Sequence, residues 1–256
     1  MVPRLIFIVS YRDREQQLLF FKRHMQYILE DIHPDEYKIL FIHQCDNRSF
    51  NRGALKNIGF IAVRDMYPND YKTITLVFND IDTMPYTKNF LNYYTKPGYI
   101  KHFYGFTFTL GGIVSITGDD FESINGFPNF WTWGYEDNML NTRALKKHLV
   151  IDRSHFYPIL NKNIIQFHDG YLRNMNRSEL DRYEHNTTEG WSSLRDIQYQ
   201  IVVDDSIKTM SFVNVYSFNT GINEDSKYTI QHDLRKGSNP FKHGRSNKIG
   251  MKFSNR

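Results

Sequence analysis

Apolar and polar positions alternate with two different periods along the first eighty residues. Short apolar runs at residues 4–10, 37–44 and 72–80 are each followed by polar clusters, which is typical of buried strands. Residues 15–32 and 52–66, between these runs, carry apolar side chains at helical spacing. This order of strand, helix, strand, helix, strand predicts a parallel sheet with covering helices, an α/β fold.

The second half of the chain follows a less regular pattern. Residues 106–117 predict extended structure that contains a Gly-Gly pair, and residues 117–127 predict a short helix. A further helix is expected to begin near Glu136. Residues 193–203 and 209–219 predict a closing β-hairpin.

Size and cysteine content narrow the class of protein. A chain of 256 residues that is 40% hydrophobic can bury a substantial core in one large domain or two small ones. No apolar run has the length of a membrane span, and the start of the chain lacks the features of a signal peptide. The single cysteine, Cys45, excludes an internal disulfide and fits a reducing compartment. We therefore expect a cytoplasmic or otherwise soluble protein without membrane insertion.

The positive charge is concentrated at the C-terminal end. Residues 226–256 carry eight Lys or Arg residues and one acid, whereas the net charge of the whole chain is only +4. We expect one domain over residues 1–225 and a basic, flexible tail over residues 226–256. A basic tail can also bind nucleic acid, but no motif supports that alternative, so no nucleic acid partner is expected.

Polar clusters follow each of the three N-terminal strands. Ligands of such sheets bind beyond the carboxyl ends of the strands. Arginine forks match the oxygens of a diphosphate, and aromatic rings beside them could flank a nucleobase. Taken singly, each such residue is more often an ordinary surface arginine or a half-buried ring. The candidates at the first two strand ends are Tyr11, Arg12, Arg14, Phe50 and Arg52.

Two aspartates follow the third strand. In an extended chain, Asp80 and Asp82 would point the same way and bring two negative charges together, which is costly unless water or a cation offsets them. The spacing alone favours a solvated turn, whereas a diphosphate bound by the nearby arginines would call for a divalent cation. Oxygen ligands suit Mg²⁺ or Mn²⁺, and an imidazole ligand from His168 would favour Mn²⁺. The alternatives are a solvated turn and an ordinary half-buried histidine.

The segment at residues 129–138, "NFWTWGYEDN", combines tryptophans with acids at a helix start. Tryptophan faces stack on sugars, and carboxylates near the positive end of a helix stay ionised. An ionised carboxylate beside a sugar hydroxyl is a general base. The alternative is core tryptophans beside ordinary helix N-terminal acids. The candidates are Trp131, Trp133, Gly134, Glu136 and Asp137.

These segments together resemble the β-1,4-galactosyltransferase family. The resemblance runs in order over most of residues 5–218, through "SYRDREQQL", "FNRGALKNIGF", "DID", "GGIVSIT", "INGFPNFWTWGYED" and "FHD". The most specific part is Asn-Gly-Phe-Pro-Asn followed by Trp-x-Trp-Gly-x-Glu-Asp.

The resemblance implies a GT-A fold, in which a Rossmann-like nucleotide-sugar-binding sheet is joined to an acceptor-side α+β region. It also implies a Mn²⁺-dependent, inverting transfer of galactose, N-acetylgalactosamine or a related hexose from a UDP-sugar to a glycan or glycoside hydroxyl, with a β-1,4 linkage. By position, it makes Asp82 and His168 metal ligands, Asp137 the base and Glu136 its catalytic neighbour. The implied nucleotide-sugar contacts are Tyr11, Arg12, Arg14, Phe50, Arg52, Asp80, Ile81, Asp82, Thr109, Gly111, Gly112 and Trp133, and the implied acceptor contacts are Trp131, Trp133, Gly134, Glu136 and Asp137.

Several positions depart from the family pattern. Ile165 stands where the family often has a methionine ligand, and Gln166 stands where some branches have a second histidine. Thr109 replaces a tyrosine that limits donor size, and Thr132 replaces a glycine. The family's usual anchor, stem and disulfide cysteines have no counterpart in the sequence. The missing ligand leaves an alternative open, namely a nucleotide-sugar- or glycan-binding protein of the same fold without turnover.

Overall fold

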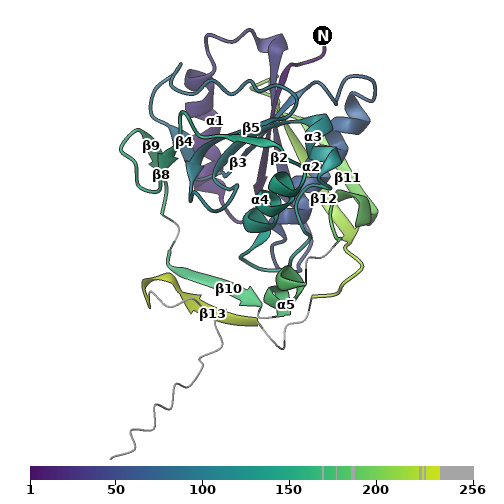
Figure 1. The fold of residues 1–256 in the computed structure, drawn as a ribbon. Helices are drawn as coiled ribbons and strands as arrows, with labels where there is room; N and C mark the ends of the chain where they lie inside the picture. Colours follow the sequence, from purple (N-terminus) through teal and green to yellow (C-terminus); the bar gives the residue numbers. More distant parts are fainter. Residues whose placement is uncertain (169, 177, 186–187, 225–226, 228, 237–256) are drawn as a thin grey trace, which may run out of the picture.

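A mixed β-sheet forms the centre of the protein in the computed structural model, which describes all residues except 169, 177, 186–187, 225–226, 228 and 237–256 (Figure 1). The strand order is β11-β12-β2-β1-β3-β6-β5-β7, with β8 paired to β5. The strands of this sheet are β1 (Leu5–Tyr11), β2 (Tyr37–Gln44), β3 (Thr75–Asn79), β5 (Tyr99–Gly105), β6 (Ile113–Thr117), β7 (Val150–Asp152), β8 (Tyr157–Pro158), β11 (Arg195–Val203) and β12 (Met210–Asn219).

Helices and two small strand pairs complete the described fold. The strand pairs are β4 (Thr83–Pro85) with β9 (Ile164–Gln166), and β10 (Leu172–Asn176) with β13 (Thr229–Asp233). The α-helices are α1 (Glu15–Ile28), α2 (Arg52–Met66), α3 (Gly118–Ser123), α4 (Glu136–Lys146) and α5 (Ser178–Glu184). Short 3-10 helices are η1 (Pro34–Glu36), η2 (Trp191–Ser193) and η4 (Leu234–Lys236).

The first three strands of the sheet are parallel, as the N-terminal pattern predicts. Leu5 of β1 lies opposite Tyr37 of β2 on one side and opposite Thr75 of β3 on the other. Their carboxyl ends therefore meet at one edge. Helix α2 has the predicted bounds, whereas α1 ends at Ile28 rather than at residue 32.

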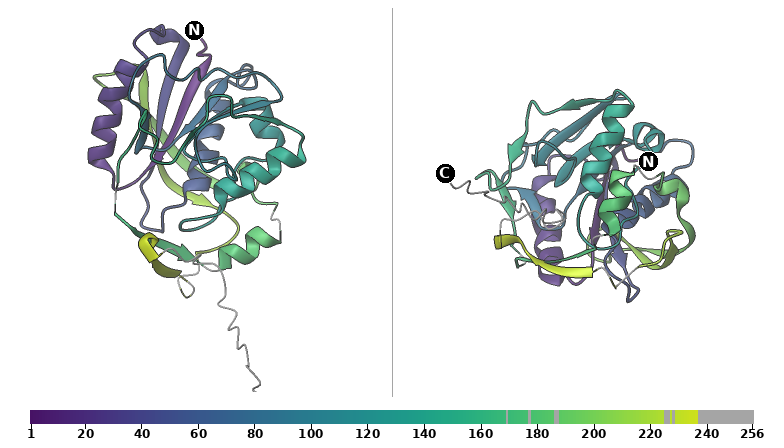
Figure 2. Two further views of the ribbon diagram at one scale, coloured as in Figure 1. Left: turned by 60° about the vertical axis from the view of Figure 1, so that its left-hand side comes forward. Right: turned by 60° about the horizontal axis from the view of Figure 1, so that its bottom comes forward.

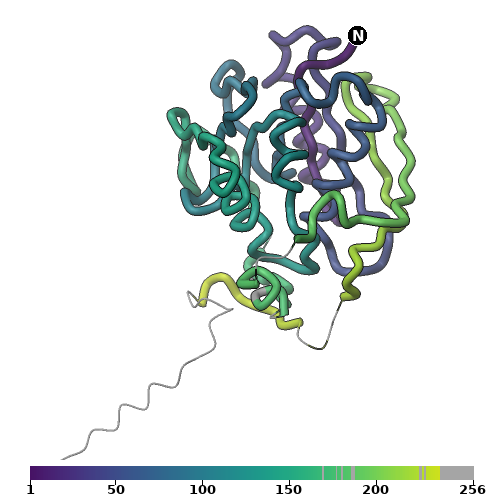
Figure 3. The backbone as a smooth tube through the Cα atoms, turned by 45° about the vertical axis from the view of Figure 1, so that its right-hand side comes forward, coloured from purple at the N-terminus to yellow at the C-terminus, as the bar shows by residue number. Residues whose placement is uncertain are grey.

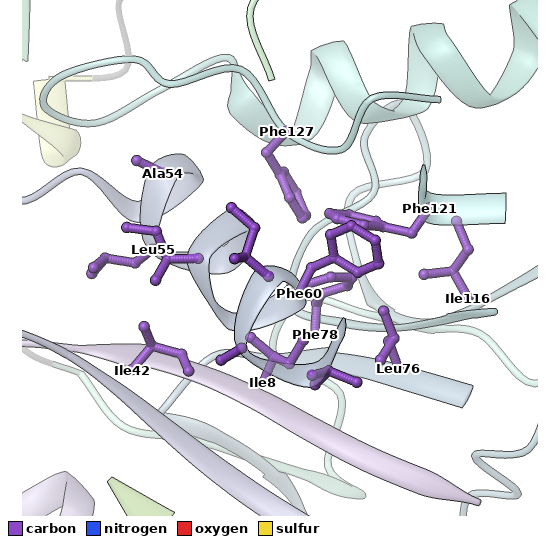
Figure 4. Packing of buried hydrophobic residues seen from close by; sticks show 14 of the residues in the cluster. Ile8, Ile42, Ala54, Leu55, Phe60, Leu76, Phe78, Ile116, Phe121 and Phe127 are labelled. Atoms are coloured by element: carbon purple, nitrogen blue, oxygen red, sulfur yellow. The ribbon is translucent and has the colours of Figure 1, made fainter. Parts of the chain in front are cut away.

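The alternation of β1 separates two apolar layers. Leu5, Phe7 and Val9 pack with α1 on one face, whereas Ile6 and Ile8 pack with α2 on the other. Figure 2 shows α1 and α2 on opposite faces of the sheet, and Figure 4 shows part of the α2 layer. Each fully buried side chain of this size contributes about 1.5–3 kcal/mol, so the site rests on a rigid base.

The expected extended segment at residues 106–117 is wrong in its first half. The Thr109 backbone N–H donates to the Phe106 carbonyl at 3.2 Å, which makes a turn. Gly112 has φ of +73°, and a Cβ there would lie 2.3 Å from the Tyr104 carbonyl oxygen. Such a conformation belongs to glycine, so the chain turns before β6 begins at Ile113.

The segment predicted as a flexible tail is partly ordered. Residues 229–233 form β13, which pairs with β10, and residues 237–256 lie outside the described residues. Figures 1 and 3 show β10, β13 and α5 together beyond the carboxyl edge of the sheet. Within the residues that the structure describes, no helix has the length and apolar character that crossing a membrane requires.

Candidate active site

The site begins where α2 starts, next to the carboxyl end of β2. Asn51 caps the helix, because its side chain accepts from the Ala54 N–H at 2.9 Å. The Asn51 N–H donates to the Gln44 side chain at 2.9 Å, and its amide group donates to the Asn129 carbonyl at 3.1 Å. These bonds fix the first helical residue, Arg52, between the end of β2 and the loop that leads to α4.

Arg52 joins three carboxylates. Its Nη2 donates to both oxygens of Asp80, at 2.7 and 2.9 Å. Its Nη1 donates to Glu136 Oε1 and to Asp137 Oδ2, each at 2.8 Å. The carboxylates come from the end of β3 and the first turn of α4, so one guanidinium connects the proposed donor side with the proposed acceptor side.

Lys56 is a second cation in this cluster, and the sequence analysis missed it. It lies one turn after Arg52 on the same face of α2 and is only 1% exposed. Its Nζ lies 3.5 Å from Asp80 Oδ1, 3.7 Å from Asp137 Oδ1 and 4.7 Å from the centroid of the Phe127 ring. The i, i+4 spacing of Arg52 and Lys56 was the available sequence signal.

The cluster favours the charged forms of Asp80 and Arg52. Burial opposes ionisation of Asp80, but Arg52 and Lys56 outweigh burial and hold the pKa of this carboxyl below its ordinary value. Burial likewise opposes the charge of Arg52, yet Asp137, Asp80 and Glu136 raise its pKa. The residues thus form a tight ionic network at the strand ends.

The Gly-Gly pair at 111–112 packs against both carboxylate segments. A Cβ on Gly111 would lie 2.2 Å from Asp137 Oδ2. The Leu110 N–H donates to the Asp137 carbonyl and the Asp80 N–H donates to the Gly112 carbonyl, both at 3.0 Å. Thr109, which precedes Leu110, is 7% exposed. The glycines therefore provide the space in which the carboxylates lie.

The β4–β9 pair brings together the two backbone segments that carry the predicted metal ligands Asp82 and His168. Thr83 lies opposite Gln166, and the next N–H along β9, that of Phe167, donates to the Asp82 carbonyl at 2.8 Å. His168 follows directly and is exposed. Among the described residues, no group of three or more His, Cys, Asp or Glu side chains could hold a metal ion.

The two departures beside His168 have other contacts. Ile165 belongs to the core on the α1 face of the sheet, and the Gln166 side chain accepts from the Tyr104 hydroxyl at 2.6 Å. Neither side chain is available as a third ligand in this structure. Of the positions that the family pattern assigns to the metal, the described residues therefore offer one carboxylate, Asp82, and one imidazole, His168.

The remaining nucleotide candidates lie in different environments. Arg12 lies over the Phe50 ring, 5.7 Å from its centroid, and also donates to the Arg48 carbonyl. Tyr11 is buried and stacks on His43 with centroids 4.7 Å apart. Arg14 is half-buried at the N-cap of α1. Ile81 is also buried, so only its backbone is available to a ligand.

The two tryptophans of the 129–138 segment differ in exposure. Trp133 is 43% exposed and lies near the carboxylates in sequence, whereas Trp131 is 2% exposed. The Trp131 ring stacks on Phe218 with centroids 5.6 Å apart, and its Nε1–H donates to the Ile222 carbonyl at 2.9 Å. Thr132 has φ of +71°, which breaks the extended geometry that would align the rings. Trp131 is therefore a core residue here, and we remove it from the acceptor contacts.

Two family models match adjacent parts of the chain. The model described as the N-terminal region of glycosyl transferase group 7 matches residues 2–96, and the model described as the N-terminal domain of galactosyltransferase matches residues 96–167. The chain belongs to the β-1,4-galactosyltransferase family.

Relatives of this family member include human β-1,4-galactosyltransferase 4, which is 28% identical over 220 residues, 78% of this chain and 60% of the relative. The xylosylprotein 4-β-galactosyltransferase of Caenorhabditis elegans is 28% identical over 230 residues, 83% of this chain and 78% of the relative. The chain thus spans less than two thirds of the length of the human relative.

Solved structures of Drosophila β-1,4-galactosyltransferase 7 share the fold. Its catalytic domain in complex with xylobiose has a TM-score of 0.68 at 22% identity and covers 84% of this chain and 94% of that one. A mutant of the same enzyme in complex with manganese, UDP-Gal and xylobiose has a TM-score of 0.65 at 21% identity. The predicted GT-A fold is confirmed.

Proposed function

We propose that this family member is a metal-dependent, inverting glycosyltransferase that moves galactose, N-acetylgalactosamine or a related hexose from a UDP-sugar to a sugar hydroxyl with a β-1,4 linkage. The observation that carries the proposal is the Arg52 network, which joins Asp80 at the strand edge to Glu136 and Asp137 at the α4 start. It provides a cationic group for a donor and a carboxylate for an acceptor within one hydrogen-bonded cluster.

The donor side is the edge where β1, β2 and β3 end. Arg12 over Phe50, together with Arg52, provides guanidinium groups for a diphosphate and an aromatic face for a uracil ring. In this proposal, Asp80 accepts hydrogen bonds from ribose hydroxyls. In the reaction, these arginines stabilise the negative charge that grows on the departing diphosphate.

The acceptor side is formed by Trp133 and the start of α4. The exposed Trp133 ring gives a surface for a sugar, and Glu136 and Asp137 lie next to it in sequence. Asp137 takes the proton of the attacking hydroxyl while the acceptor oxygen forms its bond to the anomeric carbon. The bond from that carbon to the diphosphate breaks on the opposite face, and UDP leaves with the bonding electrons.

Mn²⁺ fits the residues at the β4–β9 pair. Asp82 and His168 would hold it, since a carboxylate and an imidazole are a donor set that Mn²⁺ accepts, and the diphosphate and water would complete the shell. The bound ion supplies charge neutralisation for the leaving diphosphate. The manganese and UDP-Gal bound to the Drosophila relative support this reading.

The test is a screen of UDP-sugars against simple acceptor glycosides with Mn²⁺, followed by analysis of the anomeric configuration and position of the new bond. We expect transfer of galactose or N-acetylgalactosamine with inversion, and a loss of turnover of about 10²-fold or more in Asp137→Asn, since general base catalysis contributes about that much. Asp119 is exposed and lies outside the network. The matched control is therefore Asp119→Asn, which should keep the activity of the parent.

The alternative is a binding protein of the same fold without turnover, favoured by the two-residue ligand set. Calorimetric binding of UDP with Mn²⁺ but no product with any donor and acceptor pair would establish this alternative and exclude the transferase.

A further inference from the structure

Lys56 is one of the largest fully buried side chains of the described residues, and it carries a charge. A buried ammonium is costly unless it is paired. Its two carboxylate neighbours, Asp80 at 3.5 Å and Asp137 at 3.7 Å, belong to opposite sides of the proposed reaction. Packing alone does not explain a charged side chain at this buried position.

Lys56 and Arg52 differ in what they can reach. The Arg52 side chain is 16% exposed, whereas that of Lys56 is 1% exposed and lies against the Phe127 ring. Arg52 is therefore partly accessible to a bound donor, whereas Lys56 is shielded from a ligand. If Arg52 turns, Asp137 loses one of its two cationic neighbours and keeps only the other.

The two oxygens of Asp137 have different surroundings. Oδ2 is bonded to Arg52 at 2.8 Å. Oδ1 is buried and accepts no hydrogen bond from any described residue, and Lys56 Nζ is the cation at 3.7 Å from it. Lys56 thus offsets the negative charge near Oδ1, whereas Arg52 donates its hydrogen bond to Oδ2.

Further charged groups face Asp137 from other elements. Asp80 at the end of β3 and Glu136 on α4 are like charges that share Arg52. His102 on β5 lies close enough to feel the charge, but burial lowers its pKa to about 4, so it is neutral near pH 7. Without Lys56, the three carboxylates would share a single arginine.

We propose that Lys56 is a positioning residue that keeps Asp137 ionised, and therefore able to accept the proton, while Arg52 is engaged with the donor. The catalytic part of this inference rests on the proposed function. Its electrostatic part concerns the free protein and can be tested without turnover.

The experiment compares Lys56→Met with the parent chain and with Lys72→Met, which removes an exposed lysine that pairs with Asp119 and Glu122. In Lys56→Met the acid limb of the kcat profile should move to higher pH by about one to three units, because an opposite charge at this distance has that effect on a carboxyl group. At a pH below the shifted limb, kcat should fall about tenfold or more, while KM for the donor changes little. Lys72→Met should match the parent.

Carboxylate NMR of the free protein provides the readout that needs no activity. The titration midpoint of the Asp137 carboxyl should be at least about one pH unit higher in Lys56→Met than in the parent. If Lys56→Met does not fold, Lys56→Gln serves the same comparison. An unchanged midpoint, or a kcat that falls equally at every pH, would overturn the proposal. A parent chain without transferase activity would instead overturn the proposed function, and the NMR result would still decide the role of Lys56.

Discussion

At the scale of single residues, the active-site cluster depends on glycine and other small residues that leave space, as well as on charged side chains. Gly111 leaves the space that Asp137 Oδ2 occupies, and Thr109 lies two residues before it. The buried ammonium group of Lys56 lies within 4 Å of two carboxylates, those of Asp80 and Asp137. Both kinds of position can be tested by single substitutions.

Gly111→Ala should reduce kcat by about 10²-fold with little change in melting temperature. The added methyl group meets Asp137 Oδ2 at 2.2 Å, and moving a reacting group by about 1 Å costs a factor of that order. The matched control is Gly112→Ala. Gly112 has φ of +73°, a conformation that strains an alanine by about 1–3 kcal/mol, so this variant should lower the melting temperature. Steady-state kinetics and thermal denaturation distinguish the two, and parental kcat in Gly111→Ala would contradict the prediction.

Thr109→Tyr should shift donor preference towards UDP-galactose over UDP-N-acetylgalactosamine. A threonine leaves room beside the C2 substituent of the donor, whereas a tyrosine would exclude an acetamido group by steric repulsion. Small steric changes in pockets are worth roughly 1–3 kcal/mol, so the ratio of the two kcat/KM values should change by about 10- to 200-fold. If the parent already rejects N-acetylated donors as strongly as the variant, another residue limits the pocket.

At the scale of elements, short strand pairs bring together groups that are distant in sequence. The β4–β9 pair places Asp82 next to the segment that carries His168. The α2 start is held by Gln44 and Asn129 through Asn51, so Arg52 faces the end of β3 and the start of α4. These contacts are the reason why the proposed metal ligands and the ionic network lie at the same edge.

Activity should require a divalent ion, with Mn²⁺ more effective than Mg²⁺, because the protein offers a carboxylate and an imidazole. Exhaustive chelation should abolish turnover, and Mn²⁺ should restore it. Asp82→Ala should remove both the activity and the effect of Mn²⁺ on UDP binding measured by calorimetry, whereas Asp119→Ala should behave as the parent. Undiminished turnover after chelation would exclude the metal site.

At the scale of the whole molecule, one sheet joins the N-terminal strand β1 to the β11–β12 hairpin, through β2. Strand β12 pairs in parallel with β2 and antiparallel with β11, which makes the β11–β12 hairpin the edge of the sheet beside the nucleotide side. Lys22 on α1 forms an ion pair with Asp204 in the turn of that hairpin. This contact links the β11–β12 edge of the sheet to helix α1.

Asp204→Asn should lower the free energy of unfolding by about 2 kcal/mol near pH 7. Burial would raise the pKa of Asp204, but Lys22 and Ser206 outweigh it and lower the pKa to about 2. Because the folded pKa lies below the ordinary value, the stabilisation is present above about pH 4 and is lost as the pH falls towards 2. Urea denaturation at several pH values should therefore show a difference from the parent that narrows in acid. A constant difference would contradict the assignment.

The local pattern of the chain was sufficient for those parts of the fold whose determinants are close in sequence. The strands β1 and β2 and the helix α2 follow from apolar periodicity, and the short helix expected within residues 117–127 is α3, capped by Thr117, which accepts from the Asp120 N–H. Their hydrogen bonds or buried stripes lie within one element, so the period alone identifies them. The family motifs added the roles of Asp80, Asp82 and Asp137, which remain predictions.

Tertiary structure decided the contacts between segments that are far apart in the sequence. The β10–β13 pair, the burial of Trp131 beside an exposed Trp133, and the position of Lys56 between Asp80 and Asp137 each depend on partners dozens of residues away. Local periodicity carries no information about such distant partners. The same lysine, four residues after Arg52, would be an ordinary surface charge if β3 and α4 packed elsewhere. The ionic cluster exists because the parallel strands end at one edge and the Gly111–Gly112 turn allows α4 to approach it.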